Sequence, residues 1–187
     1  MVTSRRLLLC SLVLCLLASL AYAHSPSSSH SSTKAIAIFK EWIGQQEQRP
    51  NRSPLIDSMN RYVGNPLGAP YCAAAVSYAY YKAGNPFVKS GLARNLRTKQ
   101  TYSAYDVFVG KKQVRKGDIL IWQKGETISG HAAVAKDDWV GRSGPTDEGN
   151  TSPGNAGSQS DGGGFWERWR TISPTSYFRI KWITPYA

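Results

Sequence analysis

The chain is organised around one stretch, Gly68-Ala69-Pro70-Tyr71-Cys72-Ala73-Ala74-Ala75-Val76-Ser77-Tyr78. Its small and apolar residues predict a helix that begins at about Cys72 and runs to Ala83, where Gly84 ends it. A helix N-terminus presents unpaired backbone N–H groups and the positive end of the helix dipole, and both favour the thiolate form of a cysteine. Cys72 is therefore a candidate nucleophile. The alternative is that it is a small buried hydrophobe in an alanine-rich helix.

Residues 1–23 have the pattern of a secretory signal peptide. Two arginines precede an apolar run from Leu7 to Leu20, and the small-residue pattern Ala21-Tyr22-Ala23 marks a cleavage site. A membrane span needs about 20 apolar residues, and this run is shorter. We therefore expect export to the periplasm, the cell wall or the extracellular space, with no stable membrane anchor.

Removal of this segment would leave Cys72 as the only cysteine, because the other two are Cys10 and Cys15. An exported protein with one unpaired thiol exposes it to oxidation unless the thiol is used, which favours catalysis. Loss of Arg5 and Arg6 would also lower the formal net charge from +11 to +9. A basic exported protein is expected to associate with anionic cell-envelope polymers. The scattered lysines and arginines do not favour nucleic acid as a partner.

The rest of the chain predicts one α+β domain. Residues 24–33 are rich in serine and are expected to form a flexible leader before a single catalytic domain at residues 34–187. Helices are expected first, at Lys34–Gln46, Ser53–Tyr62 and Cys72–Ala83, followed by an irregular connection over Phe87–Tyr105. Strands are expected at Ile119–Trp122 and His131–Ala135, paired as a hairpin, and at Phe165–Ile172 and Tyr177–Ile183. Gly141–Thr146 is expected to form a turn and Gly149–Gly164 a long loop. The part of this loop from Ser152 to Gly164 follows the candidate orienter and could border a substrate cleft, or form an ordinary exposed connection. Helices followed by strands predict N-terminal helices packed on an antiparallel sheet.

His131 is the only histidine in the expected folded domain, and it begins a strand after Gly130. One cysteine and one histidine far apart in sequence are typical of a thiol nucleophile and its base. Glu148 or Asn150 could accept the second ring N–H of the imidazole and fix its tautomer. The alternative for each is an ordinary structural polar residue.

With these residues assembled, the chain resembles the cysteine- and histidine-dependent amidohydrolase/peptidase (CHAP) family, in the papain-like group that includes the NlpC/P60 wall hydrolases. The resemblance rests on Pro70–Ala74, Gly117–Leu120, Gly130–Val134 and Glu148–Thr151. It implies a papain-like fold with Cys72 as nucleophile, His131 as base, Glu148 as orienter and Asn150 as an additional polar member. Tyr71, where many relatives have Trp or Gln, is a candidate for lining the oxyanion site or cleft.

The resemblance implies cleavage of amide bonds in peptidoglycan, by an N-acetylmuramoyl-L-alanine amidase or a peptide endopeptidase. The acidic loop that binds calcium in some relatives is not visible, and one cysteine with one histidine is too few for a zinc site, so we expect no metal and no other cofactor. Two alternatives stay open: a non-catalytic cell-wall or glycan-binding module, and a secreted thiol protease or effector that acts on protein. An inhibitor or immunity protein is left open as a partner.

Overall fold

The computed structural model describes residues 27–86, 89–154, 157–158 and 160–186. The expected signal peptide, residues 1–23, lies outside these residues, as does the start of the expected leader. Within the described ranges the chain forms α-helices α1 (Ser27–Trp42), α2 (Pro54–Val63), α3 (Cys72–Lys82) and α4 (Ala104–Phe108), the 3-10 helix η1 (Ala93–Leu96), and strands β1 (Tyr102–Ser103), β2 (Ile119–Lys124), β3 (Gly130–Ala135), β4 (Ser143–Thr151), β5 (Gly164–Thr171) and β6 (Phe178–Thr184).

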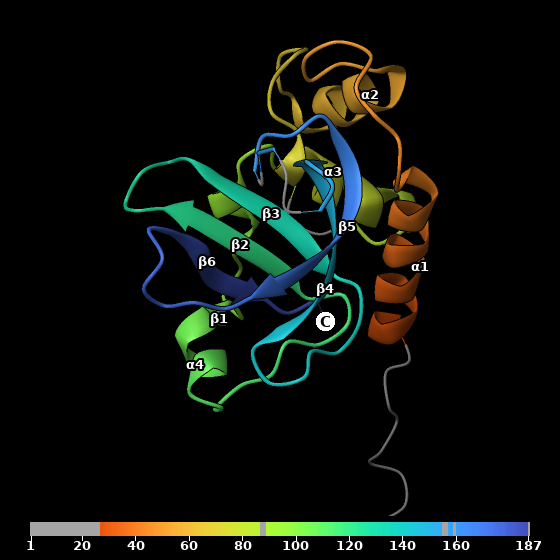
Figure 1. Ribbon diagram of the computed structural model, residues 1–187. Coiled ribbons are helices and arrows are strands. Elements are labelled where there is room, and N and C mark those ends of the chain that lie inside the picture. Colours follow the sequence, from red (N-terminus) through yellow and green to blue (C-terminus); the bar gives the residue numbers. More distant parts are fainter. Residues whose placement is uncertain (1–26, 87–88, 155–156, 159, 187) are drawn as a thin grey trace, which may run out of the picture.

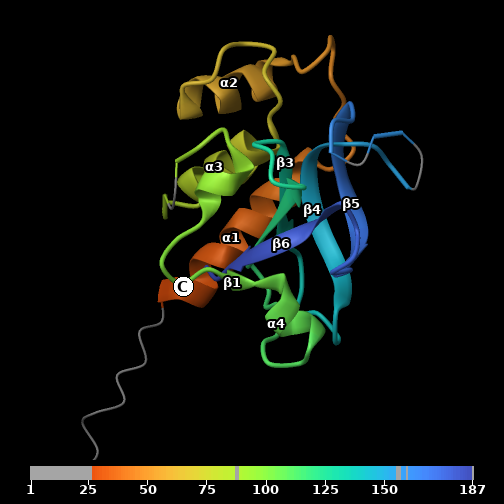
Figure 2. The same ribbon diagram turned by 90° about the vertical axis from the view of Figure 1, so that its left-hand side faces the viewer.

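The strands form one antiparallel sheet in the order β1-β6-β2-β3-β4-β5. Helices α1 and α3 pack on this sheet, and α2 packs on α3 (Figures 1 and 2). The α+β class expected from the sequence is confirmed, and so is the pairing of β2 with β3, which places Trp122 opposite His131. In the connection expected to be irregular, the structure places η1, β1 and the start of α4.

Both faces of the central strands are buried, each by a different set of apolar residues. On one face Ile119, Ile121 and Val134 pack with residues of α1, α2 and α3. On the other, Leu120, Ala133 and Ile180 are among the buried residues that pack with α4. Because successive side chains of a strand point to opposite faces, a short apolar run such as β2 contributes to both layers.

The first residues of α3 lie against the sheet because their side chains are small. Ala73, Ala74 and Ala75 are fully buried. At the far end of the helix the Tyr80 hydroxyl donates to the carbonyl oxygen of Gly117 at 2.5 Å. The alanines permit close approach, and the tyrosine ties α3 to the turn before β2, so the N-terminus that carries Cys72 is held beside β3 and β4.

Two expectations about local structure are wrong. Residues 27–33 of the expected leader are helical, because α1 begins at Ser27. Ser32 is buried close to Gly117, where a methyl group on the glycine would lie only 2.3 Å from Ser32 Cβ. Small serines can thus pack where a bulkier residue could not, and tertiary contact outweighs their modest helix preference.

The second correction concerns residues 141–164. Most of the turn and the beginning of the loop expected there belong instead to β4, which pairs with β5 from Ser143 to Thr151. The strand has no apolar alternation because Thr146, Glu148 and Asn150 are polar and buried. Hydrophobic periodicity therefore gave no signal for the strand that carries the candidate orienter.

Candidate active site

Cys72 is the first residue of α3, preceded by Tyr71 at the N-cap position. The Tyr71 side chain makes no capping hydrogen bond. The first N–H groups of a helix have no partner within it, so they remain available to an anion formed beside Cys72. Cys72 is the one free cysteine among the described residues and is 6% exposed.

His131 is fully buried in β3, and its two ring nitrogens have different surroundings. Its Nε2 lies 2.8 Å from Glu148 Oε2. Its Nδ1 is buried and has no hydrogen-bond partner other than Cys72 among the described residues. Burial lowers the pKa of the imidazole, but hydrogen bonding and charge from Cys72 and Glu148 outweigh burial and raise the pKa to about 9. The ring is thus anchored through Nε2, which leaves Nδ1 for the thiol.

The Glu148 carboxylate is held by hydrogen bonds from three side chains. Its Oε1 accepts from Thr146 Oγ1 at 2.6 Å and from Arg170 Nε at 2.7 Å, and its Oε2 accepts from Arg170 Nη2 at 2.5 Å as well as facing the imidazole. Burial raises the pKa of this carboxyl, yet the bonds and positive charges of Arg170 and His131 lower it to about 2. Glu148 is therefore ionised over the whole physiological range.

Arg170, on β5, contacts the site in two ways. Its guanidinium forms the bidentate bond to Glu148 and lies over the Trp122 ring, 5.5 Å from the ring centroid. Trp122 in turn meets the His131 ring edge to face, with centroids 5.3 Å apart. A bidentate guanidinium with a cation–π contact fixes a carboxylate more rigidly than a single bond would.

Sequence reasoning did not identify Arg170, Thr146 or this role of Trp122. The available signal was the alternation of Arg168 and Arg170 within an expected strand, which places both on one face. The sequence did not indicate which carboxylate these arginines would bind, because the neighbouring strand β4 was expected to be a turn and a loop.

The imidazole hydrogen-bonds Glu148, whereas the Asn150 amide hydrogen-bonds Asp161, so Glu148 and not Asn150 is the carboxyl or amide partner of His131. Asn150 is fully buried and adopts a left-handed backbone conformation, with φ of 61°. Its Nδ2 donates to Asp161 Oδ1 at 3.5 Å, while its Oδ1 is buried with no partner among the described residues. Asn150 therefore lies near the end of β4 and contacts the loop that follows this strand.

Tyr71 does not occupy the position expected for a cleft residue. Its side chain is fully buried and packs against Phe165, with ring centroids 5.3 Å apart. Burial raises the pKa of its hydroxyl well above the usual range. The expectation that Tyr71 lines the oxyanion site or cleft is corrected because the ring belongs to the core beneath the N-terminus of α3.

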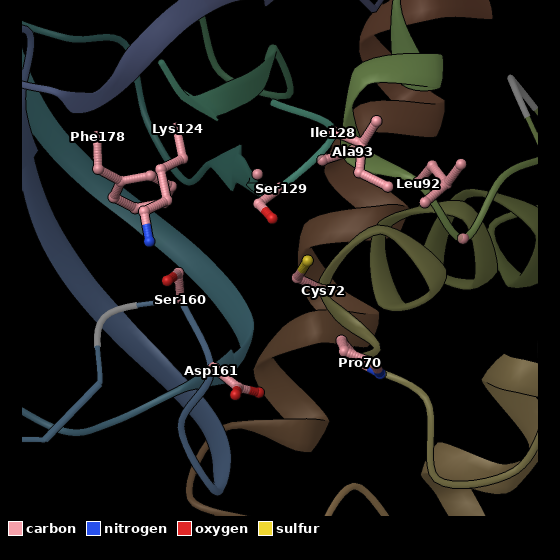
Figure 3. A pocket seen from close by; sticks show the side chains of 12 residues that line it. Pro70, Cys72, Leu92, Ala93, Lys124, Ile128, Ser129, Ser160, Asp161 and Phe178 are labelled. Atoms are coloured by element: carbon pink, nitrogen blue, oxygen red, sulfur yellow. The ribbon is translucent and has the colours of Figure 1, made fainter. Parts of the chain in front are cut away.

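A cavity of about 700 Å³ opens at Cys72. That size suits a small ligand or a short stretch of a polymer. Figure 3 shows that Cys72 lies between two walls, and that residues of the loop after β4 contribute to one of them, as the sequence suggested. The residues that line the cavity include Pro70, Cys72, Leu92, Lys124, Ser160 and Asp161.

Within the described ranges, no group of three or more His, Cys, Asp or Glu residues is placed to hold a metal ion. Nor is any described helix both long and apolar enough to span a bilayer. No protein-family model and no curated protein matches the chain.

Proposed function

We propose that the protein is an exported, CHAP-type cysteine hydrolase with a papain-like arrangement, which cleaves amide bonds of peptidoglycan. The observation that carries this proposal is that α3, β3 and β4 bring three side chains together beside the cavity at Cys72. There Cys72 stands at a helix N-terminus, His131 keeps Nδ1 without another partner, and Glu148 holds the opposite nitrogen at 2.8 Å. This is the nucleophile, base and orienter arrangement of thiol acyl transfer.

The raised pKa of His131 gives an imidazolium at neutral pH, which stabilises a thiolate at Cys72. The sulfur attacks the amide carbonyl carbon, and the electron pair of the C=O bond moves to oxygen, where the Cys72 N–H can donate to it. The C–N bond then breaks, and His131 gives its proton to the departing amine. Water, deprotonated by the now neutral His131, attacks the thioester, and thiolate and carboxylic acid are released.

The choice of peptidoglycan as substrate is supported by the signal-peptide pattern, the basic net charge and the sequence resemblance. The formal net charge of +11 favours association with anionic polymers of the envelope. The cavity of about 700 Å³ borders Cys72, and its size suits a short stretch of a polymer beside the thiol.

Digestion of purified peptidoglycan tests the proposal. The protein should be produced from its full-length chain, with its N-terminus determined by mass spectrometry, and compared with Cys72→Ala and Cys72→Ser. We expect muropeptides with a new amine and no new reducing end from the wild type, and neither from the two variants. Melting curves would show that the variants are folded.

Full lysis by Cys72→Ala would contradict the proposed mechanism. Equal binding of peptidoglycan by wild type and Cys72→Ala, with no new amine from either, would indicate a wall-binding module instead. Hydrolysis of protein but not of peptidoglycan would indicate a thiol protease.

A further inference from the structure

The cavity at Cys72 contains one cationic and one anionic side chain, Lys124 and Asp161. Neither forms an ion pair with any described residue, although half of the chain's 12 acidic residues do. In a protein with 23 lysines and arginines, a carboxylate without a cationic partner beside the nucleophile is available to a positive group on a ligand.

Asp161 is held in position by its surroundings. Its backbone N–H donates to Ser158 Oγ at 2.8 Å, and the next residue, Gly162, donates its N–H to the carbonyl oxygen of Asn150 at 3.0 Å. The buried Asn150 amide reaches its carboxylate through Nδ2. A carboxylate fixed in this way loses little conformational freedom when it binds a ligand.

The buried amide that contacts Asp161 has one unsatisfied atom. Asn150 is fully buried, and its Oδ1 has no hydrogen-bond partner among the described residues. The oxygen belongs to the same amide group whose Nδ2 donates to Asp161. Because an unsatisfied buried acceptor is costly, a donor that reached this oxygen would relieve that cost.

Lys124 lies on the same wall of the cavity. It ends β2, where it is paired with Phe178 of β6. Figure 3 shows Cys72 between two walls. Lys124, Phe178, Ser160 and Asp161 lie on one wall, and the opposite wall, with Pro70, Leu92 and Ala93, is apolar. The cavity is thus complementary to a ligand that carries both charges on one side and small apolar groups on the other.

We infer that this cavity selects a zwitterionic peptide, with an ammonium group against Asp161 and a carboxylate against Lys124, close to the amide that Cys72 attacks. The inference rests on the proposed function and names its substrate class. The ammonium can come from a free peptide N-terminus or from the side chain of a diamino acid. Both present the same chemistry to Asp161.

Soluble stem peptides of peptidoglycan that contain a diamino acid provide the test. One peptide has both amines free, one is acetylated at the N-terminus, one is acetylated on the side-chain amine, and one has its carboxylates amidated. We expect acetylation of the recognised amine to lower the kcat/KM of the wild type on the order of 10-fold to 100-fold, because it removes a hydrogen bond between charged groups. The peptide that loses activity identifies the source of the ammonium.

Three substitutions assign the effect to residues. Asp161→Asn keeps the shape of the side chain and should abolish the preference for the free amine. Lys124→Met should abolish the preference for the free carboxylate. The matched control is Asp137→Asn, an exposed aspartate whose oxygen lies 3.9 Å from Lys116 Nζ and which does not line this cavity, and it should leave both preferences unchanged.

Binding of the same peptides to the Cys72→Ala chain, measured by calorimetry, separates this inference from the proposed function. If no peptide is hydrolysed but free and acetylated peptides differ in affinity and Asp161→Asn removes the difference, the substrate class stands and the reaction is wrong. If peptides are hydrolysed with an unchanged amine preference in Asp161→Asn, the reaction stands and the inference is overturned. Absence of both binding and hydrolysis overturns both.

Discussion

Replacement of Glu148 by glutamine tests whether this carboxylate keeps His131 protonated. Glu148→Gln removes a buried charge 2.8 Å from His131 Nε2 and leaves an oxygen that can still accept a hydrogen bond. The rise of the His131 pKa from 6.5 to about 9 corresponds to roughly 3 kcal/mol. Cys72 and Glu148 both raise this pKa against the effect of burial. A unit charge pair about 4 Å apart near a protein surface contributes about 4 kcal/mol, so loss of the carboxylate removes a large part of the rise. Without it, only Cys72 opposes burial, and we expect the His131 pKa to fall by at least about one unit.

Nuclear magnetic resonance titration of the histidine ring measures this change directly. Alkylation of Cys72 by iodoacetamide provides a second measurement that requires no substrate. At neutral pH the rate should fall about 10-fold or more in Glu148→Gln, because a neutral imidazole does not stabilise a thiolate. Thr146→Val is the matched control, since it removes one hydrogen bond to Glu148 and keeps the charge. Its His131 pKa should stay within about half a unit of the wild-type value.

The same substitution leaves the Arg170 guanidinium, 14% exposed, beside a neutral side chain. Breaking a buried ion pair from one side costs about 3 kcal/mol, or roughly 6–12 °C in Tm for a domain of this size. Titrations should therefore be run well below the lowered Tm. A His131 pKa that stays near 9 in folded Glu148→Gln would refute the assignment of Glu148 as the group that holds the imidazolium.

Three further predictions concern the neighbourhood of the site. Arg170→Met should raise the pKa of Glu148, and because the stability from a lowered carboxyl pKa is lost as pH falls toward that pKa, acid unfolding should begin at a higher pH. Arg170→Lys should restore part of the resistance to acid, and far-UV circular dichroism against pH measures both variants. Gly149→Ala should lower the free energy of unfolding in urea by about 1–3 kcal/mol, since its methyl group would lie 2.9 Å from a ring carbon of β5 and 3.0 Å from a Cβ of α3. The control Gly163→Ala meets nothing within 4 Å and should change this free energy by less than about 0.5 kcal/mol. Burial raises the pKa of Asp147 to about 7, so ionisation of this carboxyl weakens the fold as pH rises from about 4 to 7. Asp147→Asn should therefore raise the free energy of unfolding in urea by on the order of 2 kcal/mol at pH 8 but change it little at pH 4.

The sequence predicted the second and third helices and the first hairpin well, because these elements depend on local signals, whereas the first helix, expected at Lys34–Gln46, lies at Ser27–Trp42. The Ser53 hydroxyl accepts from the Ile56 N–H at 3.2 Å, as its position before Pro54 indicated. The helix beginning at Cys72 follows from the small residues after Pro70 and the stop at Gly84. These patterns act within a few residues, so a single sequence suffices to read them.

The part of the site that the sequence did not reveal is a buried polar network. Hydrophobic periodicity detects strands whose inward residues are apolar, but the inward residues of β4 include Thr146 and Glu148, and they are stabilised by Arg170 from the neighbouring strand. Pairing of this kind is set by strand order and register. Cys72, His131 and Glu148 could be named as separate candidates, while the arginine that holds the carboxylate required the sheet.

The position of β6 has a consequence for when the site around Cys72 is assembled. The last strand of the chain lies between β1 and β2, in the interior of the sheet order, and pairs with both. Early segments therefore cannot complete the sheet on their own, and β2, which carries Trp122 and Lys124, lacks one neighbour until β6 is added. Contacts between segments that are far apart in the sequence form only after the chain between them has been ordered, which costs entropy. Assembly of the site around Cys72 should therefore be a late and cooperative event in folding. If the proposed function is correct, a partly synthesised or partly unfolded chain would thus leave nearby amide bonds intact, and reactivity would appear only with the complete fold.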